Sequence, residues 1–463
     1  MSSNAFCEAR GWRSVVRSLM GGINKRRGSN PAGPVARLLS SSGIYILCNV
    51  FTRAIPFLLL PVLTRYLSPE DMGTVAMYTV GIAVVMPLVG FSTEAAISRQ
   101  YFEKEEIDFP NYFTNCLYLV CVTTTAVWLG LLSFPRAIGS ALGVPSSWVW
   151  TLAVVATARY LCGATLAVWQ AQERPHAYSL LTVGQTLLNA GISLYLIVGH
   201  QFGWEGRAVG EMLGATVAAA VGLIFLVRSG LIKHGWSAVH LRHALKFGGG
   251  LMPHVYGGII IAAGDRFFLT HMVGKAETGL YVVGAQVGMI IGILEHSFNQ
   301  AWTPWLFERL KRDAPGEREL VRRVTRLYNV GILGLALLLS ALAPTFVEAF
   351  LGKDYRGATQ FVFWLALGYA FTGMYKMRAN QIFFANKTHL LSVVTALTGL
   401  TSLALNYSLI RLNGSVGAAQ ATAMALLISY LLTAFLSRRI EAVNAQWSTG
   451  IQPVRTIDHQ HSP

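Results

Sequence analysis

Ionisable side chains interrupt several long apolar runs in this sequence of 463 residues. In the clearest case, Asp265 and Arg266 are neighbours in GGIIIAAGDRFFLTHMVG, residues 257–274. A charged side chain at the centre of a bilayer costs at least ~2.5–3.5 kcal/mol, even on lenient insertion scales. Charges in such positions therefore indicate ion pairs, proton relays or polar paths, and each of them is a candidate site.

Other embedded charges differ in how deep they lie. The set comprises Arg53, Glu94, Arg99, Arg159, His254, Glu295, Lys376 and Arg378. Arg99, Lys376 and Arg378 fall near expected helix ends, where long basic side chains reach the headgroups. Arg53 and Arg159 lie well inside their runs. Arg53 also precedes Pro56 and Pro61, and a proline-kinked helix is well tolerated beside a water-filled cavity.

Asp265 and Arg266 diverge by roughly 100° on a helix, so neither is the ideal partner of the other. We expect Arg53 to face Asp265, and Glu94 or Glu295 to face Arg266. Two interpretations stay open for these carboxylates. They form structural ion pairs that fix helix depth, or Asp265, Glu94 and Glu295 bind a proton or sodium ion that drives transport.

Basic residues outnumber acidic ones among the embedded charges, which predicts a net cationic lumen. The planar guanidinium of arginine binds phosphate oxygens in pairs. Arg53, Arg159 and Arg266 are therefore candidates for binding a phosphorylated head group. Gln286 and Gln300 either bond sugar hydroxyls in the lumen or hold helices together. We predict no catalytic residue, no metal site and no cofactor.

The composition is that of a helical membrane protein. The chain is 53% hydrophobic and 13% charged, whereas soluble domains carry about 25% charged residues. Apolar runs of ~20 residues, each long enough for a bilayer core, follow one another, and the alternation of a β-barrel is missing. We predict an all-α polytopic protein with about twelve transmembrane helices. The expected spans are 42–64, 75–98, 113–134, 147–170, 177–199, 208–228, 248–272, 279–305, 327–351, 359–383, 388–410 and 416–437.

The basic residues gather in segments that an even number of spans separates. These segments are the leader, the 228–246 loop and the 306–326 loop, and the alternate loops have few charges. Cytoplasmic loops are enriched in lysine and arginine, so we predict that both termini are cytoplasmic. The net charge of +15 then needs no nucleic-acid partner.

Two stretches of the chain resemble each other. LTRYLSPEDMG at 63–73 and LTHMVGKAETG at 269–279 both open with Leu-Thr and close with Gly after the same interval. This match predicts two parallel six-helix repeats, a plan in which the substrate path runs at the repeat interface. The expected parts are a basic leader 1–40, a bundle 41–228, a basic linker 229–246, a second bundle 247–437 and a tail 438–463.

RAIPFLLLPVLTRYLSPEDMGTVAMYTVG with ISRQYFE, and TGLYVVGAQVGMIIGIL with QAWTPWLFE, resemble the Wzx-type polysaccharide flippases over about residues 40–440. The resemblance implies the multidrug/oligosaccharidyl-lipid/polysaccharide exporter superfamily, with two MATE-like bundles rocking around a central cavity. It implies a bacterial inner-membrane protein that moves a polyprenyl-pyrophosphate-linked oligosaccharide to the outer leaflet. The product would be O-antigen, capsule or exopolysaccharide. It also implies membrane lipids and polysaccharide assembly proteins as partners, proton or sodium coupling, and lumenal roles for Arg53, Asp265 and Arg266.

Two alternatives differ in class. A cation-coupled multidrug exporter on the same architecture would favour an acidic, aromatic-lined cavity, whereas this lumen is predicted to be basic. A membrane glycosyltransferase or polymerase would need a catalytic loop or an acidic metal site outside the helices. The sequence has short outer loops and lacks DxD and HExxH motifs, so we expect a transporter and not an enzyme.

Overall fold

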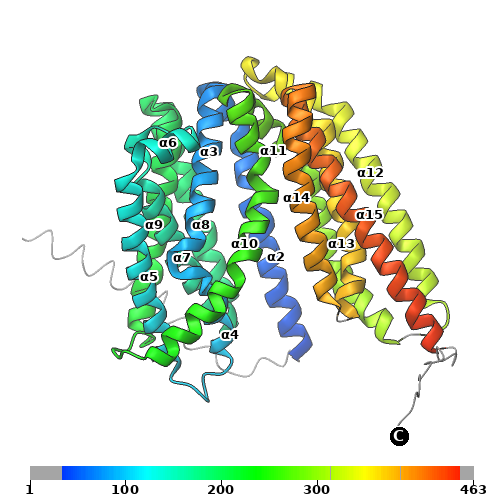
Figure 1. The fold of residues 1–463 in the computed structure, drawn as a ribbon, viewed down its shortest axis with the longest axis horizontal. Helices are drawn as coiled ribbons and strands as arrows, with labels where there is room; N and C mark the ends of the chain where they lie inside the picture. The colour runs from blue at the N-terminus through cyan, green and yellow to red at the C-terminus, as the bar shows by residue number, and fades with distance from the viewer. Residues whose placement is uncertain (1–33, 313, 386, 449–463) are drawn as a thin grey trace, which may run out of the picture. The chain divides into compact units, whose positions relative to one another are not determined.

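The computed structural model describes residues 34–448 apart from 313 and 386, and the chain from Ile46 onward packs as one compact unit. Residues 1–33 of the predicted leader and 449–463 of the predicted tail lie outside the described residues. The described chain contains helices and turns and no strand (Figure 1). The predicted all-α fold class is confirmed.

Each predicted span overlaps an α-helix, and three of the spans also include a 3₁₀ or π segment. The first predicted bundle, called the N-terminal bundle below, contains the chain segments α2 (Pro34–Tyr66), α3 (Pro69–Val85), α4 (Glu94–Tyr101), α5 (Phe109–Ser133), α6 (Pro135–Leu142), α7 (Thr151–Ala171), α8 (Pro175–Leu194) and α9 (Gly203–Arg228). The second predicted bundle, called the C-terminal bundle below, contains α10 (Ala238–Met272), α11 (Lys275–Arg312), α12 (Glu317–Phe350), α13 (Thr359–Phe384), α14 (Thr388–Asn413) and α15 (Ser415–Ser448). Short 3₁₀ or π segments are η1 (Met86–Ser92), η2 (Ser146–Trp148), η3 (Tyr195–Gly199) and η4 (Lys353–Ala358).

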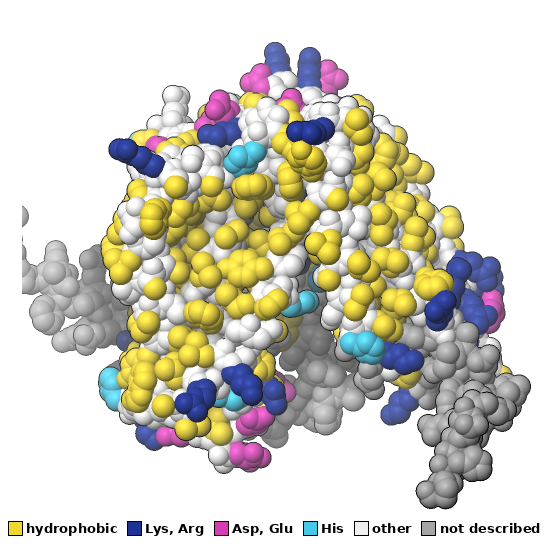
Figure 2. Space-filling model, viewed as in Figure 1, with side chains coloured by type: hydrophobic (Ala, Val, Ile, Leu, Met, Phe, Trp, Pro, Cys, Tyr) yellow, Lys and Arg dark blue, Asp and Glu magenta, His cyan; other side chains and the backbone are white. Residues whose placement is uncertain are grey.

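Ten helical segments of the described chain are long and apolar enough to cross a membrane. The surface agrees with this, since hydrophobic side chains cover the middle of the visible face and charged ones gather toward the helix ends (Figure 2). The remaining two predicted spans correspond to α10 and α13, which carry the embedded pairs Asp265–Arg266 and Lys376–Arg378.

The predicted span 75–98 is not one continuous helix. It breaks at η1, where Gly90, Phe91 and Ser92 have positive φ. Backbone groups freed in a membrane must find partners. Here the Gly90 N–H donates to Thr123 Oγ1 at 2.8 Å, and the Thr93 hydroxyl donates to the Gly90 carbonyl at 2.7 Å. The N–H and the carbonyl of Gly90 are therefore hydrogen-bonded at the break, which separates α3 from α4.

The basic connection between the bundles is shorter than predicted and is fixed to α5. Helix α10 begins at Ala238, inside the predicted linker 229–246. Lys233 Nζ lies 2.8 Å from Asp108 Oδ2, and this hydrogen-bonded ion pair lowers the pKa of the Asp108 carboxyl. Asn115 bonds both the Gly235 carbonyl and the Ser237 N–H at 3.0 Å. The connection thus packs on the N-terminal bundle.

The two repeat motifs meet each other. A Cβ atom on Gly73 would lie 2.0 Å from the Lys275 carbonyl oxygen, and one on Gly279 would lie 1.8 Å from the Pro69 carbonyl oxygen. In the repeat alignment Gly73 corresponds to Gly279 and Pro69 to Lys275. The beginnings of α3 and α11 therefore cross through a reciprocal contact, as two halves related by a pseudo-two-fold axis do.

The ends of the first helices of the two repeats are also held by the opposite bundle. Gly352 donates its N–H to Thr64 Oγ1 at 3.2 Å, and Tyr355 donates to the Leu67 carbonyl at 2.9 Å. In the other repeat, a Cβ on Gly143 would contact the side chains of Thr270 and Lys275. Contacts at Thr64, Leu67 and Gly143 therefore join the two bundles at this membrane end, in addition to the crossing of α3 and α11.

The glycine crossing predicts opposite effects for two Gly→Ala substitutions. Gly73→Ala should lower stability by ~1–3 kcal/mol, because the added methyl overpacks against backbone. Gly184→Ala on α8 should leave stability unchanged or raise it by up to ~1 kcal/mol, since the space there is open and alanine favours a helix. Thermal unfolding in detergent measures both, and equal effects of the two substitutions would contradict the crossing.

Candidate functional site

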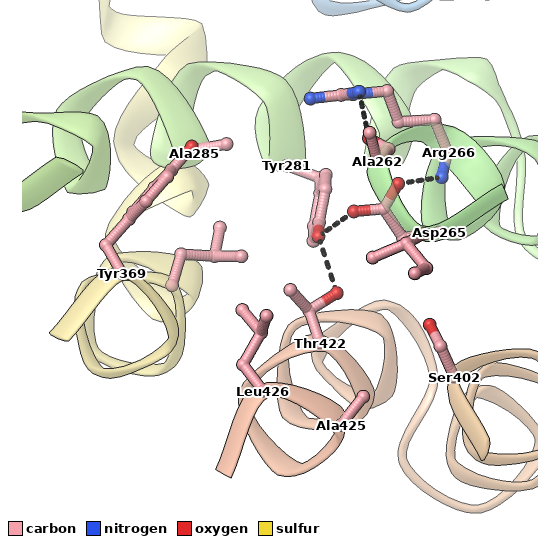
Figure 3. Close-up of a pocket in the computed structure, with 12 residues that line it drawn as sticks. Ala262, Asp265, Arg266, Tyr281, Ala285, Tyr369, Ser402, Thr422, Ala425 and Leu426 are labelled. Atoms are coloured by element: carbon pink, nitrogen blue, oxygen red, sulfur yellow. Dashed lines mark hydrogen bonds between the residues drawn. The ribbon is translucent and has the colours of Figure 1, made fainter. Parts of the chain in front are cut away.

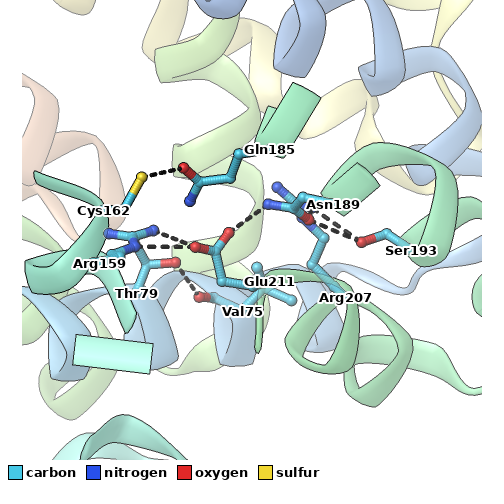
Figure 4. A network of polar contacts seen from close by, with 9 residues as sticks. All are labelled: Val75, Thr79, Arg159, Cys162, Gln185, Asn189, Ser193, Arg207 and Glu211. Atoms are coloured by element: carbon cyan, nitrogen blue, oxygen red, sulfur yellow. Dashed lines mark hydrogen bonds and ion pairs between the residues drawn. The ribbon is translucent and has the colours of Figure 1, made fainter. Parts of the chain in front are cut away.

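A cluster of charges inside the N-terminal bundle joins α7, α8 and α9 (Figure 4). Arg159 donates from Nη2 and Nε to Glu211 Oε1 at 2.6 and 3.0 Å. Asn189 Nδ2 donates to the other carboxylate oxygen at 2.5 Å. The guanidinium of Arg159, predicted to bind substrate in a cationic lumen, is thus engaged by a carboxylate of its own bundle.

The same cluster contains a second arginine. Arg207 donates from Nη1 to Asn189 Oδ1 and to Ser193 Oγ, the latter at 3.1 Å. Sequence analysis missed both Arg207 and Glu211. Their signal is GRAVGEMLG at 206–214, where an arginine and a glutamate stand four residues apart on one helix face.

Glu94 is placed directly after the break between α3 and α4. Its carboxylate lies against Gly163 of α7, where an added Cβ would be 2.8 Å from Oε1. That oxygen is buried and has no hydrogen-bond partner among the described residues. Glu94 therefore does not pair with Arg266, and it is a partly buried carboxyl with no cation bound to it in the described chain.

Glu295 forms a third site, on α11 in the C-terminal bundle. Lys376 Nζ of α13 lies 2.7 Å from Glu295 Oε1, and the side chain of Glu295 is only 5% exposed. We expected Lys376 to extend toward headgroups at a helix end. That expectation is wrong, because α11 and α13 pack closely through Gly284, Gly288 and Gly292 and bring the two side chains together.

Arg53 differs from these paired charges. It lies in the apolar middle of α2, its side chain is exposed, and its guanidinium makes no ion pair or hydrogen bond within the described residues. It lies close enough to Glu295, His296 and Tyr369 to act on them electrostatically. Arg53 therefore lies within electrostatic range of groups on α11 and α13.

Asp265 and Arg266 line a cavity of about 230 Å³ in the C-terminal bundle (Figure 3). Tyr281 donates its hydroxyl to Asp265 Oδ2 at 2.5 Å, and the Arg266 backbone N–H donates to Oδ1 at 2.7 Å. Arg266 Nη1 donates to the Ala262 carbonyl at 2.8 Å. The remaining polar lining groups are the hydroxyls of Tyr369, Ser402 and Thr422.

The expected partners of this pair were wrong. Asp265 is bonded by the neutral Tyr281 and not by Arg53, and Arg266 makes no ion pair with Glu94 or Glu295 in the described chain. The reason is the rotation of α10, which turns Asp265 toward α11 within its own bundle. Spacing along the sequence does not specify that rotation.

The two predicted glutamines lie on α11 and are half-buried. The buried Gln286 Oε1 has no hydrogen-bond partner among the described residues, and Gln300 Nε2 lies 3.1 Å from His296 Nε2. Neither bonds another helix in the described chain. Gln286 Oε1 thus lacks a partner in the described chain, whereas Gln300 is bonded to His296 one turn earlier on the same helix.

The structure brings some of the predicted residues together and leaves others apart. Tyr369 is within electrostatic range of Arg53 and Glu295 on one side and of Asp265 and Arg266 on the other. Of these groups, Asp265, Arg266 and Tyr369 line one cavity, whereas Arg53 and Glu295 lie outside its lining. Arg159 and Glu94 belong to separate sites inside the N-terminal bundle.

Known proteins agree with this architecture. Residues 38–309 match the family model described as polysaccharide biosynthesis protein. A membrane protein of Haemophilus influenzae is 25% identical over 371 residues, which cover 78% of this chain and 87% of the relative. The chain belongs to the polysaccharide biosynthesis protein family.

Solved transporters share the fold. An inward-facing multidrug resistance MATE family transporter of the MOP superfamily has a TM-score of 0.70 at 14% identity, over 85% of this chain and 96% of its own. The lipid II flippase MurJ in an inward closed conformation has a TM-score of 0.68 at 15% identity, over 88% of this chain and 93% of its own. The predicted MATE-like architecture is confirmed.

The cluster around Glu211 predicts a strong stability effect. Glu211→Gln removes the only negative charge between Arg159 and Arg207 in the described cluster, and should destabilise the protein by ~1–3 kcal/mol. The double variant Arg159→Gln/Glu211→Gln should recover part of that loss, because it removes one uncompensated cation. Thermal unfolding in detergent measures the cycle.

Glu205→Gln is the matched control on α9, since Glu205 is exposed and makes no ion pair within the described residues. It should change stability by less than ~0.5 kcal/mol. If the loss of stability in the double variant equals the sum of the losses in Arg159→Gln and Glu211→Gln, the two residues do not interact.

Proposed function

We propose that this protein is a flippase, which moves a polyprenyl-pyrophosphate-linked oligosaccharide from the inner to the outer leaflet of the bacterial inner membrane. The observation that carries the proposal is Arg53, a guanidinium in the apolar part of a membrane helix that has no ion pair within the described residues. Such a charge is costly unless it serves a polar path. Membership of a polysaccharide biosynthesis family supports a sugar-bearing cargo.

The proposed diphosphate site lies at Arg53, within electrostatic range of α11 and α13. A guanidinium offers donors in the fork geometry that phosphate oxygens accept. Gln286 and Gln300 of α11 supply amides for hydroxyl groups along the same helix. The head group crosses between the bundles while the polyprenyl chain stays in lipid, because hydroxyls and charges do not cross hydrocarbon unaided. No covalent step is needed.

The proposal includes the orientation of the protein in the membrane and the proton exchange that would drive transport. We assign the face that carries the basic 228–246 and 306–326 segments to the cytoplasm, together with both termini, because cytoplasmic loops are enriched in lysine and arginine. The joined end around Gly73 and Gly279 is then the outer end of the bundles. Glu94 is our candidate for proton coupling, since a carboxyl without a fixed cation partner can exchange a proton during the cycle. Surface-polysaccharide assembly proteins would receive the product.

A vesicle assay tests the proposed function. The purified protein is reconstituted with a fluorescent polyprenyl-pyrophosphate oligosaccharide, and transfer is followed as loss of protection from a membrane-impermeant quencher. Arg53→Ala should slow transfer ~10–100-fold, the value of a lost hydrogen bond to a charged group. Arg53→Lys should recover part of the rate, because lysine keeps the charge without the fork.

Arg65→Ala is the matched control, because Arg65 is an exposed arginine in the last turn of the same helix. It should transfer substrate at the wild-type rate. Folded wild-type protein that moves no lipid-linked oligosaccharide, but exports a cationic drug, would replace the flippase with a multidrug exporter.

A further inference from the structure

The cavity at Asp265 is too small for an oligosaccharide. Its volume is about 230 Å³, and residues of α10, α11, α13, α14 and α15 line it. Pockets that enclose drug-sized ligands have roughly 300–1,000 Å³. The cavity therefore accommodates one group of about the size of a single sugar ring, together with any water that remains.

The polar groups around the cavity come from five helices, with Asp265 and Arg266 both on α10, and Asp265, Tyr281 and Thr422 are linked by hydrogen bonds (Figure 3). Asp265 accepts two hydrogen bonds, whereas an ionised carboxylate has about four lone-pair sites. Thr422 adds a hydroxyl that lies 3.3 Å from the Tyr281 hydroxyl, and Ser402 adds one that accepts from Asn406 Nδ2 at 3.3 Å. Each hydroxyl has further capacity to donate or accept. Tyr369 adds a phenol hydroxyl. The set offers both donors and acceptors.

The charges select the class of ligand. A cation bound at Asp265 would also meet the Arg266 guanidinium, and a phosphate bound at Arg266 would meet the Asp265 carboxylate. Each arrangement includes a repulsion that the low dielectric of the interior strengthens. A neutral polyhydroxyl group meets no such repulsion, since its hydroxyls donate to Asp265 and accept from Arg266. This combination favours a sugar over an ion.

The position of the cavity, like its size and its charges, favours a sugar as the ligand. Tyr369 lies within electrostatic range of Asp265 and Arg266, and also of Arg53. A sugar ring in the cavity would consequently contact Tyr369, a residue on which the charge of Arg53 also acts. We infer that the cavity binds one sugar unit of the carried oligosaccharide, and that the groups lining it determine which sugar is accepted. This inference rests on the proposed flippase function.

Binding of free sugars is the first test. Purified protein in detergent is mixed in turn with glucose, galactose, mannose, rhamnose, N-acetylglucosamine and N-acetylgalactosamine, and saturation-transfer NMR detects bound sugar. We expect at least one sugar to bind. Its signal should fall at least several-fold in Thr422→Val and in Ser402→Ala, which remove single hydroxyls and spare the buried Asp265–Tyr281 bond.

Thr433→Val is the matched control on α15. Thr433 is fully buried, lies outside the cavity, and its Oγ1 has no hydrogen-bond partner in the described chain. It should leave the signal unchanged. No bound sugar in folded wild type, or equal signals in all variants, would overturn the inference. A further outcome would also overturn it: NaCl but not KCl raises the thermal stability, Asp265→Asn abolishes this effect, and no sugar binds. The cavity would then be a cation site.

Transport specificity is the second test. Vesicles receive polyprenyl-pyrophosphate bearing either N-acetylglucosamine or N-acetylgalactosamine, which differ only in the configuration of one hydroxyl. A site that hydrogen-bonds a hydroxyl discriminates strongly, so Thr422→Val or Ser402→Ala should change the wild-type preference at least ~10-fold. If the variants transfer lipid-linked saccharides with the wild-type preference, the inference of a sugar site is wrong, whereas the flippase proposal is unaffected. No transfer of any lipid-linked saccharide by wild type overturns the flippase itself.

Discussion

The backbone contact between α3 and α11 is the constraint on which the arrangement of the two bundles depends. Membrane helices gain no hydrophobic energy from meeting each other, so their association relies on close packing and on hydrogen bonds. Gly73 and Gly279 permit an approach that any Cβ would block. Because they are equivalent residues of the two repeats, one sequence motif supplies both sides of the contact. A rotation of one bundle against the other has to pivot on this crossing or separate it.

Buried charges are distributed in a way that suits such a rotation. Arg159 pairs with Glu211 inside the N-terminal bundle, and Lys376 with Glu295 inside the C-terminal bundle. Breaking a buried pair is costly because one charge is left uncompensated. Since each pair lies within one bundle, the bundles can turn as bodies without breaking either pair. Arg53, without a partner in the described chain, remains at the boundary.

The sequence predicted the helices and the repeats well, because the bilayer dictates the length of an apolar run and duplication preserves the Leu-Thr to Gly spacing at 63–73 and 269–279. The sequence did not predict the hydrogen-bond and ion-pair partners of the embedded charges. Pairing depends on how each helix is rotated, and α10 turned Asp265 toward the neutral Tyr281. The break at η1 was also missed, since the lost backbone bonds are recovered by Thr123 on another helix. Such compensation is tertiary and leaves no local pattern.

The position of Arg53 suggests how cargo would bias the two states. Its helix belongs to the first repeat, but the end of that helix docks on the second bundle through Thr64 and Leu67. Without cargo, the positive charge of Arg53 acts on the Lys376–Glu295 ion pair across the boundary. A diphosphate bound at Arg53 would replace this positive charge by a net negative one. A ligand shifts a conformational equilibrium only through differential interaction with its states, and such a change of charge near the ion pair is one interaction of this kind.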